Sequence, residues 1–176
     1  YLCTTKHTSK GSNTSKLVLY TYDITSNTWT DTILASDLTG FSAALYVTDN
    51  GDTYSTAIRY SNKGPYTIYK NGTALFTKTF NIYVTDLNIL YVDDTYVYIA
   101  YTSSNDKGNI SKFTMSGTET VLASFDGASV GIDSRYIAYY TIDSNTSTRK
   151  YIIGYMDNGT VVEWANKCPN ITNSLY

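Results

Sequence analysis

Apolar and polar residues alternate along most of the chain, in short runs separated by turn-forming residues. A period of two predicts strands that bury one face. One pattern consists of an apolar strand ending in Asp, a tight turn and a second, tyrosine-rich strand. It occurs at 43–60 and 87–101, and a weaker copy lies at 128–142. The spacing of these copies is about 40 residues, and no helix is evident between them.

A repeat of this length made only of strands is typical of a β-propeller blade. We therefore predict one all-β domain, a four-bladed β-propeller, with a β-sandwich as the alternative. The blades are expected at 1–38, 39–82, 83–126 and 127–168. Their strands are expected at 2–7, 16–23, 28–34, 42–48, 53–60, 66–70, 74–80, 87–92, 96–103, 110–115, 119–125, 128–132, 136–142, 151–156 and 161–165. The last hairpin of each later unit has a turn glycine: Gly72, Gly117 and Gly159.

The two ends of the chain suggest how such a ring closes. The first unit is one strand short, and residues 169–176 are left over, so we expect them to supply the closing strand. Cys3 and Cys168, the two cysteines, would then lie close enough for a disulfide, which would contribute roughly 5 kcal/mol in the chain-entropy model. Two unpaired buried thiols, or a chain that is part of a longer repeat array, are the alternatives.

Composition narrows the class of protein. The chain has 19 tyrosines, and only 16% of its residues are charged, compared with about 25% in an ordinary soluble domain. A net charge of −2 provides no basic surface, so we expect no nucleic-acid partner. No apolar run approaches the ~20 residues of a membrane span. No charged-then-apolar leader is recognised, so we expect any export signal to have been removed or never to have been present. The expected core residues are Leu17, Leu19, Leu45, Val47, Val97, Ile99, Ile137 and Ile152.

Six Asn-X-Ser/Thr triplets suggest N-glycosylation, at Asn13, Asn71, Asn109, Asn145, Asn158 and Asn170. Asn71 and Asn158 lie in Asn-Gly turns, and Asn13 and Asn145 lie in polar loops, where a transferase could reach them. Asn-Gly is also the preferred two-residue hairpin turn, so these triplets are explained either by glycosylation or by turn formation alone. Together with the cysteines they favour an extracellular or cell-surface location.

Candidates for chemistry are few. His7, the single histidine, has no evident catalytic partners and is expected near the surface of the first unit. Acidic residues recur at equivalent hairpins and should gather on one face: Asp49, Asp52, Asp93, Asp94 and Asp133. The 49–52 loop is rich in oxygen ligands but lacks the spacing of an EF-hand, so we predict no metal site or cofactor, with calcium left open. An Asp-based hydrolase remains the enzymatic alternative.

Exposed aromatic residues offer a binding function, because tyrosine and tryptophan faces stack on sugar rings. The candidates for such a site are Trp29, Trp164, Tyr54, Tyr96 and Tyr136. Packing between blades is the competing explanation for the same residues.

Residues 16–30 resemble the second half of a kelch motif, in which a Tyr-x-Tyr-Asp strand leads through a turn to Asn-Thr-Trp. The kelch double glycine is absent, and the resemblance implies only the propeller topology. The four-unit count is similar to hemopexin-type propellers, and the composition is similar to secreted surface, filament or virion proteins of archaea. We therefore expect a non-enzymatic extracellular glycoprotein that assembles with itself in a filament, sheath or virion. A carbohydrate-binding adhesin that recognises surface glycans is the alternative.

Overall fold

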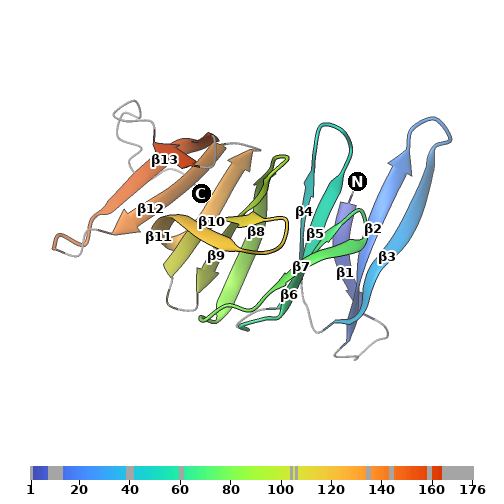
Figure 1. Cartoon of the computed structure of the whole chain (residues 1–176), viewed down its shortest axis with the longest axis horizontal. Helices are drawn as coiled ribbons and strands as arrows, with labels where there is room; N and C mark the ends of the chain where they lie inside the picture. Colours follow the sequence, from blue (N-terminus) through green and yellow to red (C-terminus); the bar gives the residue numbers. More distant parts are fainter. Residues whose placement is uncertain are drawn as a thin grey trace.

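The computed structural model describes residues 2–7, 14–38, 42–59, 62–103, 105, 107–133, 136–142, 145–157 and 160–163. Within these residues the fold is all-β, as the alternation predicts, and the strands form three antiparallel sheets (Figure 1). The first sheet has the order β1-β2-β3, formed by Leu2–His7, Ser15–Asp23 and Thr28–Leu38. The second has the order β4-β5-β6-β7, formed by Ser42–Val47, Thr53–Ile58, Tyr66–Lys70 and Thr73–Lys78. The third runs from β8 to β14, formed by Val84–Val92, Tyr96–Ser103, Lys107–Thr114, Glu119–Asp133, Tyr136–Ile142, Arg149–Asp157 and Thr160–Glu163.

Every strand pairs with the strand that precedes or follows it in the sequence, so each sheet is a simple meander. The predicted strands are confirmed with differences of a few residues at their ends, except that 119–125 and 128–132 form one strand and that 164–165 lie outside the described residues. Gly72 and Gly117 have φ values of +82° and +88°, which explains why glycine occupies these hairpin turns.

The prediction of four separate sheets is wrong for the third and fourth units. A break was expected between 125 and 128, but β11 is continuous from Glu119 to Asp133 and pairs with β10 and β12 in turn. Its register shifts between Asp126 and Val130, around Gly127. An isolated glycine in a strand often marks an irregularity rather than an end, so the ladder bends here and continues.

The second sheet packs face to face with the first three strands of the third sheet. The main core cluster joins the second sheet to one face of β8–β10, and its members include Tyr54, Ile68 and Phe76 from one side and Leu87, Val97, Ile99 and Phe113 from the other. A second cluster covers the opposite face and includes Tyr98, Ala100, Ile110, Phe125 and Ile152. Strand β9 is therefore buried on both faces, since its odd-numbered residues face one cluster and its even-numbered residues face the other.

Most of the predicted core is confirmed. The buried residues among those predicted are Leu17, Leu19, Val97, Ile99 and Ile152. Leu45 and Val47 are half-buried, and the side chain of Ile137 lies outside the described part. The hydroxyls of buried tyrosines have partners: Tyr66, for example, donates to the carbonyl oxygens of Arg59 and Asn62 at 2.8 and 2.9 Å.

The three sheets form an open row in the described residues. β1 contacts β4, and β4 contacts β8, so the first strands of consecutive units are neighbours. In Figure 1 the β1–β3 sheet lies at one end of the long axis, and β12 and β13 lie at the other. A closed ring is not seen among these residues. The predicted closing strand 169–176, Cys168 and the side chain of Cys3 lie outside the described part.

Candidate functional site

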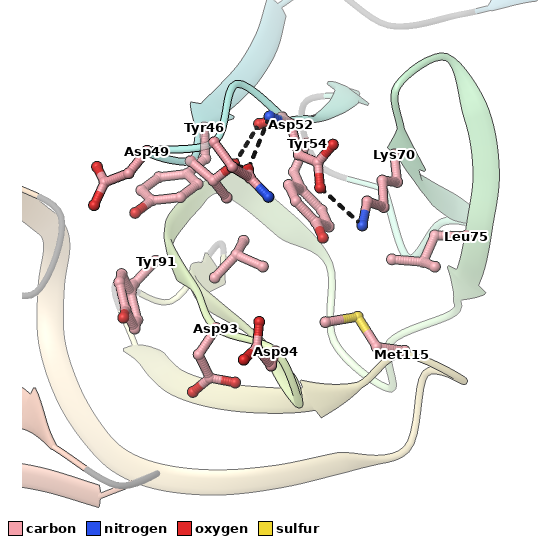
Figure 2. Close-up of a pocket in the computed structure, with 13 residues that line it drawn as sticks. Tyr46, Asp49, Asp52, Tyr54, Lys70, Leu75, Tyr91, Asp93, Asp94 and Met115 are labelled. Carbon is pink, nitrogen blue, oxygen red and sulfur yellow. Dashed lines mark hydrogen bonds and ion pairs between the residues drawn. The ribbon is translucent and has the colours of Figure 1, made fainter.

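A hollow of about 530 Å³ opens between the second sheet and the β8–β9 hairpin (Figure 2). In Figure 2, Asp49 and Asp52 lie on one side of it, and Asp93 and Asp94 lie on the opposite side. The expectation that these four aspartates gather on one face is confirmed. The side chain of Asp133, the fifth predicted member, is not described.

The first side of the hollow is the β4–β5 turn. Thr48 N–H donates to the carbonyl oxygen of Asp52 at 2.9 Å, and Gly51 N–H donates to the carbonyl oxygen of Thr48 at 2.9 Å. Gly51 has a φ of +87°. The Asp52 carboxylate accepts from Asn71 Nδ2 at 2.7 Å and from Lys70 Nζ at 3.0 Å. These two donors, Asn71 first, hold the pKa of Asp52 below its usual value, and Asp52 in turn raises the pKa of Lys70.

The opposite side is the β8–β9 turn. Asp93 Oδ1 accepts from the amides of Thr95 and Tyr96 at 2.8 and 2.7 Å, and Oδ2 accepts from the Tyr98 hydroxyl at 2.8 Å. Burial, followed by the bond to Asp93, raises the pKa of Tyr98. Asp93 is thus a turn-forming residue whose carboxylate is occupied. Asp94 is exposed, and its carboxylate has no hydrogen-bond or ion-pair partner within the described residues; the same holds for Asp49.

Aromatic and apolar side chains complete the hollow. Tyr46 and Tyr91 meet edge to face, with ring centroids 6.1 Å apart and an interplanar angle of 82°. Leu75 and Met115 line the other wall, as Figure 2 shows. Four carboxylates against the single Lys70 make the hollow unsuitable for an anion. Its mixture of aromatic edges, carboxylates and an amide suits a polyhydroxylated or cationic ligand.

Tyr46, Tyr91, Lys70 and Met115 were not among the predicted site residues. The signal for the two tyrosines is the repeated Leu-Tyr-Val, at 45–47 and 90–92. Aligning these triplets makes Tyr46 equivalent to Tyr91 and Asp49 equivalent to Asp94. The hollow is therefore built from the same positions of two consecutive repeats.

No metal centre is found in the described part: no three His, Cys, Asp or Glu side chains are arranged there to hold an ion. Nor does that part contain a helix long and apolar enough to cross a membrane. His7 is at the end of β1, where it pairs with Ser15, and its side chain is not described.

The predicted aromatic site residues do not form one surface. Tyr54 lines the hollow but is only 3% exposed, whereas Trp29 is 58% exposed and lies elsewhere, on β3. Tyr96 is half-buried, with Lys112 Nζ 4.6 Å from its ring centroid. Tyr136 pairs with Tyr155 in the β12–β13 ladder, and its side chain is not described; Trp164 is outside the described residues.

The predicted glycosylation sites also differ in setting. Asn71 and Asn145 are exposed in turns. Asn109 lies within β10, where its Nδ2 donates to the Tyr101 hydroxyl at 3.0 Å and its Oδ1 accepts from Ser124 at 2.7 Å. Asn13, Asn158 and Asn170 lie outside the described part.

A second candidate surface is the tip of the β2–β3 hairpin, residues 20–33, which we call the arm. Its turn is firmly built: the Asp23 carboxylate accepts from the amide of Thr25 and from Ser26 Oγ, both at 2.8 Å. The bond from the Ser26 hydroxyl, followed by bonds from the backbone amides of Thr25 and Ser26, lowers the pKa of Asp23. Tyr22 and Trp29 are cross-strand partners with ring centroids 5.0 Å apart. The arm therefore presents aromatic side chains to solvent on an ordered hairpin.

Comparisons with protein-family models, with curated proteins and with solved structures give no match to this chain. The function is therefore argued from the two surfaces themselves.

Proposed function

We propose that this protein is a non-enzymatic extracellular glycoprotein that assembles with copies of itself, as a repeating subunit of a surface filament, sheath or virion. The observation that carries the proposal is the arm. Four of its large apolar side chains are exposed: Tyr22, Ile24, Trp29 and Ile33, at 38%, 83%, 58% and 51%.

Such exposure needs an explanation, because large apolar side chains that gather in the solvent-exposed part of one hairpin often mark an interaction site. A mobile loop would gain little from docking, since ordering it costs conformational entropy. The arm is already ordered by its ladder and by the Asp23 turn, so docking it costs little of this kind. Tyrosine and tryptophan are also the side chains that contribute most at protein interfaces.

The extracellular glycoprotein part of the proposal is supported by the exposed triplets at Asn71 and Asn145 and by the low charge of the surface. A neutral, hydroxyl-rich surface has little charge repulsion to keep copies apart. Intact mass measured with and without reductant tests this part. We expect added glycan mass and a mass difference of two hydrogens, and an unmodified chain with two free thiols would contradict it.

Closure of a four-bladed ring by residues 169–176, with a Cys3–Cys168 disulfide, also stays a proposal. Its support is that the second sheet packs face to face with β8–β10 and that β1 contacts β4, which in turn contacts β8. Peptide mapping without reductant decides it: a linked peptide pair that contains Cys3 and Cys168 is expected, and separate peptides would reject the closure.

A carbohydrate-binding adhesin is the second candidate, favoured by the Tyr46–Tyr91 wall and the unpartnered Asp49 and Asp94 carboxylates of the hollow. A glycan array tests it with the native protein and the Asp94→Ala variant. Binding that is lost in the variant supports this candidate, and a native protein that binds no glycan removes it.

Self-assembly itself is tested by light scattering over a range of concentrations and by electron microscopy of the purified full chain. We expect the mean mass to rise with concentration and ordered particles to form. A protein that stays monomeric at all concentrations would refute the proposed function.

A further inference from the structure

The arm has two chemically different faces. Residues paired directly across an antiparallel ladder point to the same side of the sheet. The pairs Val18–Ile33, Tyr20–Asp31 and Tyr22–Trp29 therefore form one face, which we call the tryptophan face. The pairs between them, Thr21–Thr30 and Leu19–Thr32, form the opposite face, which is dominated by threonine.

Two pairs of the tryptophan face are open to a partner. The outer pair, Tyr22–Trp29, is apolar and the middle pair, Tyr20–Asp31, is polar, whereas at the inner pair Ile33 is 51% exposed and Val18 is buried. The middle pair supplies both a hydroxyl donor and a carboxylate acceptor. A face with this pattern can be its own complement, which is what an interface between two identical copies requires.

We propose that the tryptophan face docks on the tryptophan face of a second copy. This inference rests on the proposed self-assembly. The two copies are related by a two-fold axis that runs along the arm. This axis places β2 of one copy over β3 of the other. Each Asp31 then faces the Tyr20 hydroxyl of the second copy, and each Trp29 lies on Tyr22 of the second copy.

The charge on the face selects this axis. A two-fold axis across the strands would place Asp31 over Asp31 of the second copy, so two like charges would oppose each other in a desolvated interface. The axis along the arm replaces that repulsion with two hydrogen bonds between a hydroxyl and a carboxylate, a charge-assisted type of bond.

The exposed side chains of the face supply the apolar part of a dimer contact. The exposed parts of Tyr22, Trp29 and Ile33 amount to roughly 300 Å² per copy when a large side chain is taken to bury about 200 Å². Two copies would therefore bury about 600 Å² of apolar surface, against the ~1,000 Å² at which specific interfaces begin. The neighbouring polar side chains of the arm would add to this area.

The experiment is sedimentation equilibrium on the full chain and three variants. Trp29→Ala should weaken the association of two copies roughly 100-fold, the effect expected of an aromatic anchor in the interface. Tyr20→Phe should weaken it roughly 10-fold, because it leaves Asp31 without its donor. Thr30→Ala is the matched control: Thr30 follows Trp29 in the sequence but lies on the opposite face, so the association should not change.

The outcomes separate this inference from the proposed function. If the native protein assembles and Trp29→Ala assembles equally well, the docking face is wrong while self-assembly stands. If Thr30→Ala weakens the contact as much as Trp29→Ala, the assignment of the face is also wrong. A native protein that never associates overturns both. Circular dichroism of each variant checks that the fold is kept, which is expected because Trp29 and Thr30 are exposed.

Discussion

A buried phenol in the third sheet should make the protein sensitive to alkali in a way that one substitution can reverse. Tyr101 is 4% exposed, and its hydroxyl donates to Glu119 at 2.7 Å. Burial, followed by the bond to Glu119, raises the pKa of Tyr101 from 10.0 to about 12. We therefore consider the variant Tyr101→Phe, which removes the titrating group and keeps the ring.

The direction of the effect follows from which state loses its proton first. Between pH 10 and 12 the phenol ionises in the unfolded chain but stays protonated in the folded protein. The unfolded state then binds fewer protons, so the free energy of unfolding falls as pH rises. A difference of two pKa units corresponds to a loss of about 2 kcal/mol by pH 12 and somewhat more above it.

At pH 8 the same hydroxyl stabilises the fold. Its loss in Tyr101→Phe leaves Glu119 with Ser111 Oγ at 2.9 Å and Lys78 Nζ at 2.7 Å, and should cost about 1–2 kcal/mol. The native protein should therefore be the more stable of the two at pH 8. Near pH 12 the order should become equal or reverse.

Urea unfolding followed by circular dichroism, repeated at steps from pH 8 to 12, measures both free energies. Tyr83→Phe is the control for removal of a phenol hydroxyl, because Tyr83 is 53% exposed. If the native and Tyr101→Phe curves stay parallel up to pH 12, the reasoning from burial is refuted.

Three further predictions address packing, acid stability and modification. Gly108→Ala should lower the free energy of unfolding, measured in urea, by about 3 kcal/mol, because a Cβ there would lie 2.2 Å from Cζ of the buried Phe125. Gly51→Ala is the control, because a Cβ there would meet no atom within 4 Å; it should lower the free energy of unfolding by only about 1 kcal/mol, from the strain of the positive φ. Burial acts to raise the pKa of Glu119, but bonds from Lys78, Tyr101 and Ser111 outweigh it and lower this pKa, so stability should fall as pH drops below about 4.5, and less steeply in Glu119→Gln. Glycopeptide mass spectrometry of the natively expressed protein should find glycan at Asn71 and Asn145, which are exposed in turns, and none at Asn109, which is half-buried in β10 between two paired strands; occupied Asn109 would contradict its place in the sheet.

The sequence was sufficient to predict the strands, because alternation and turn glycines are local signals. It also predicted that Asp49, Asp52, Asp93 and Asp94 gather, since repeats place equivalent turns on the same side. It did not predict that β11 continues past Gly127. Whether a glycine ends a strand or bends it depends on the partner strand, and β12 pairs with the second half of β11.

The role of individual aromatic residues could not be read from local pattern. Tyr54 and Trp29 both occupy strand positions next to turns, yet one is 3% and the other 58% exposed. The difference arises because Tyr54 faces the third sheet in the main core cluster, whereas no such cluster covers Trp29 in the described residues. Exposure here is a property of sheet stacking, and sheet stacking involves residues distant in the sequence.

The contrast between the units also explains why the arm can carry an assembly function. One face of the second sheet is matched by a face of β8–β10, and the opposite face of β8–β10 packs with residues of β11 and β13 of the same sheet, so alternation produces a core there. In the first unit the same alternation produces an apolar face on β2 and β3, but β3 contacts chiefly β2 in the described residues. Trp29 and Ile33 are accordingly 58% and 51% exposed in this structure. A second copy that presents the same face would remove this exposed area without any change in the fold of either chain, which is why we place the contact on the arm rather than at the hollow.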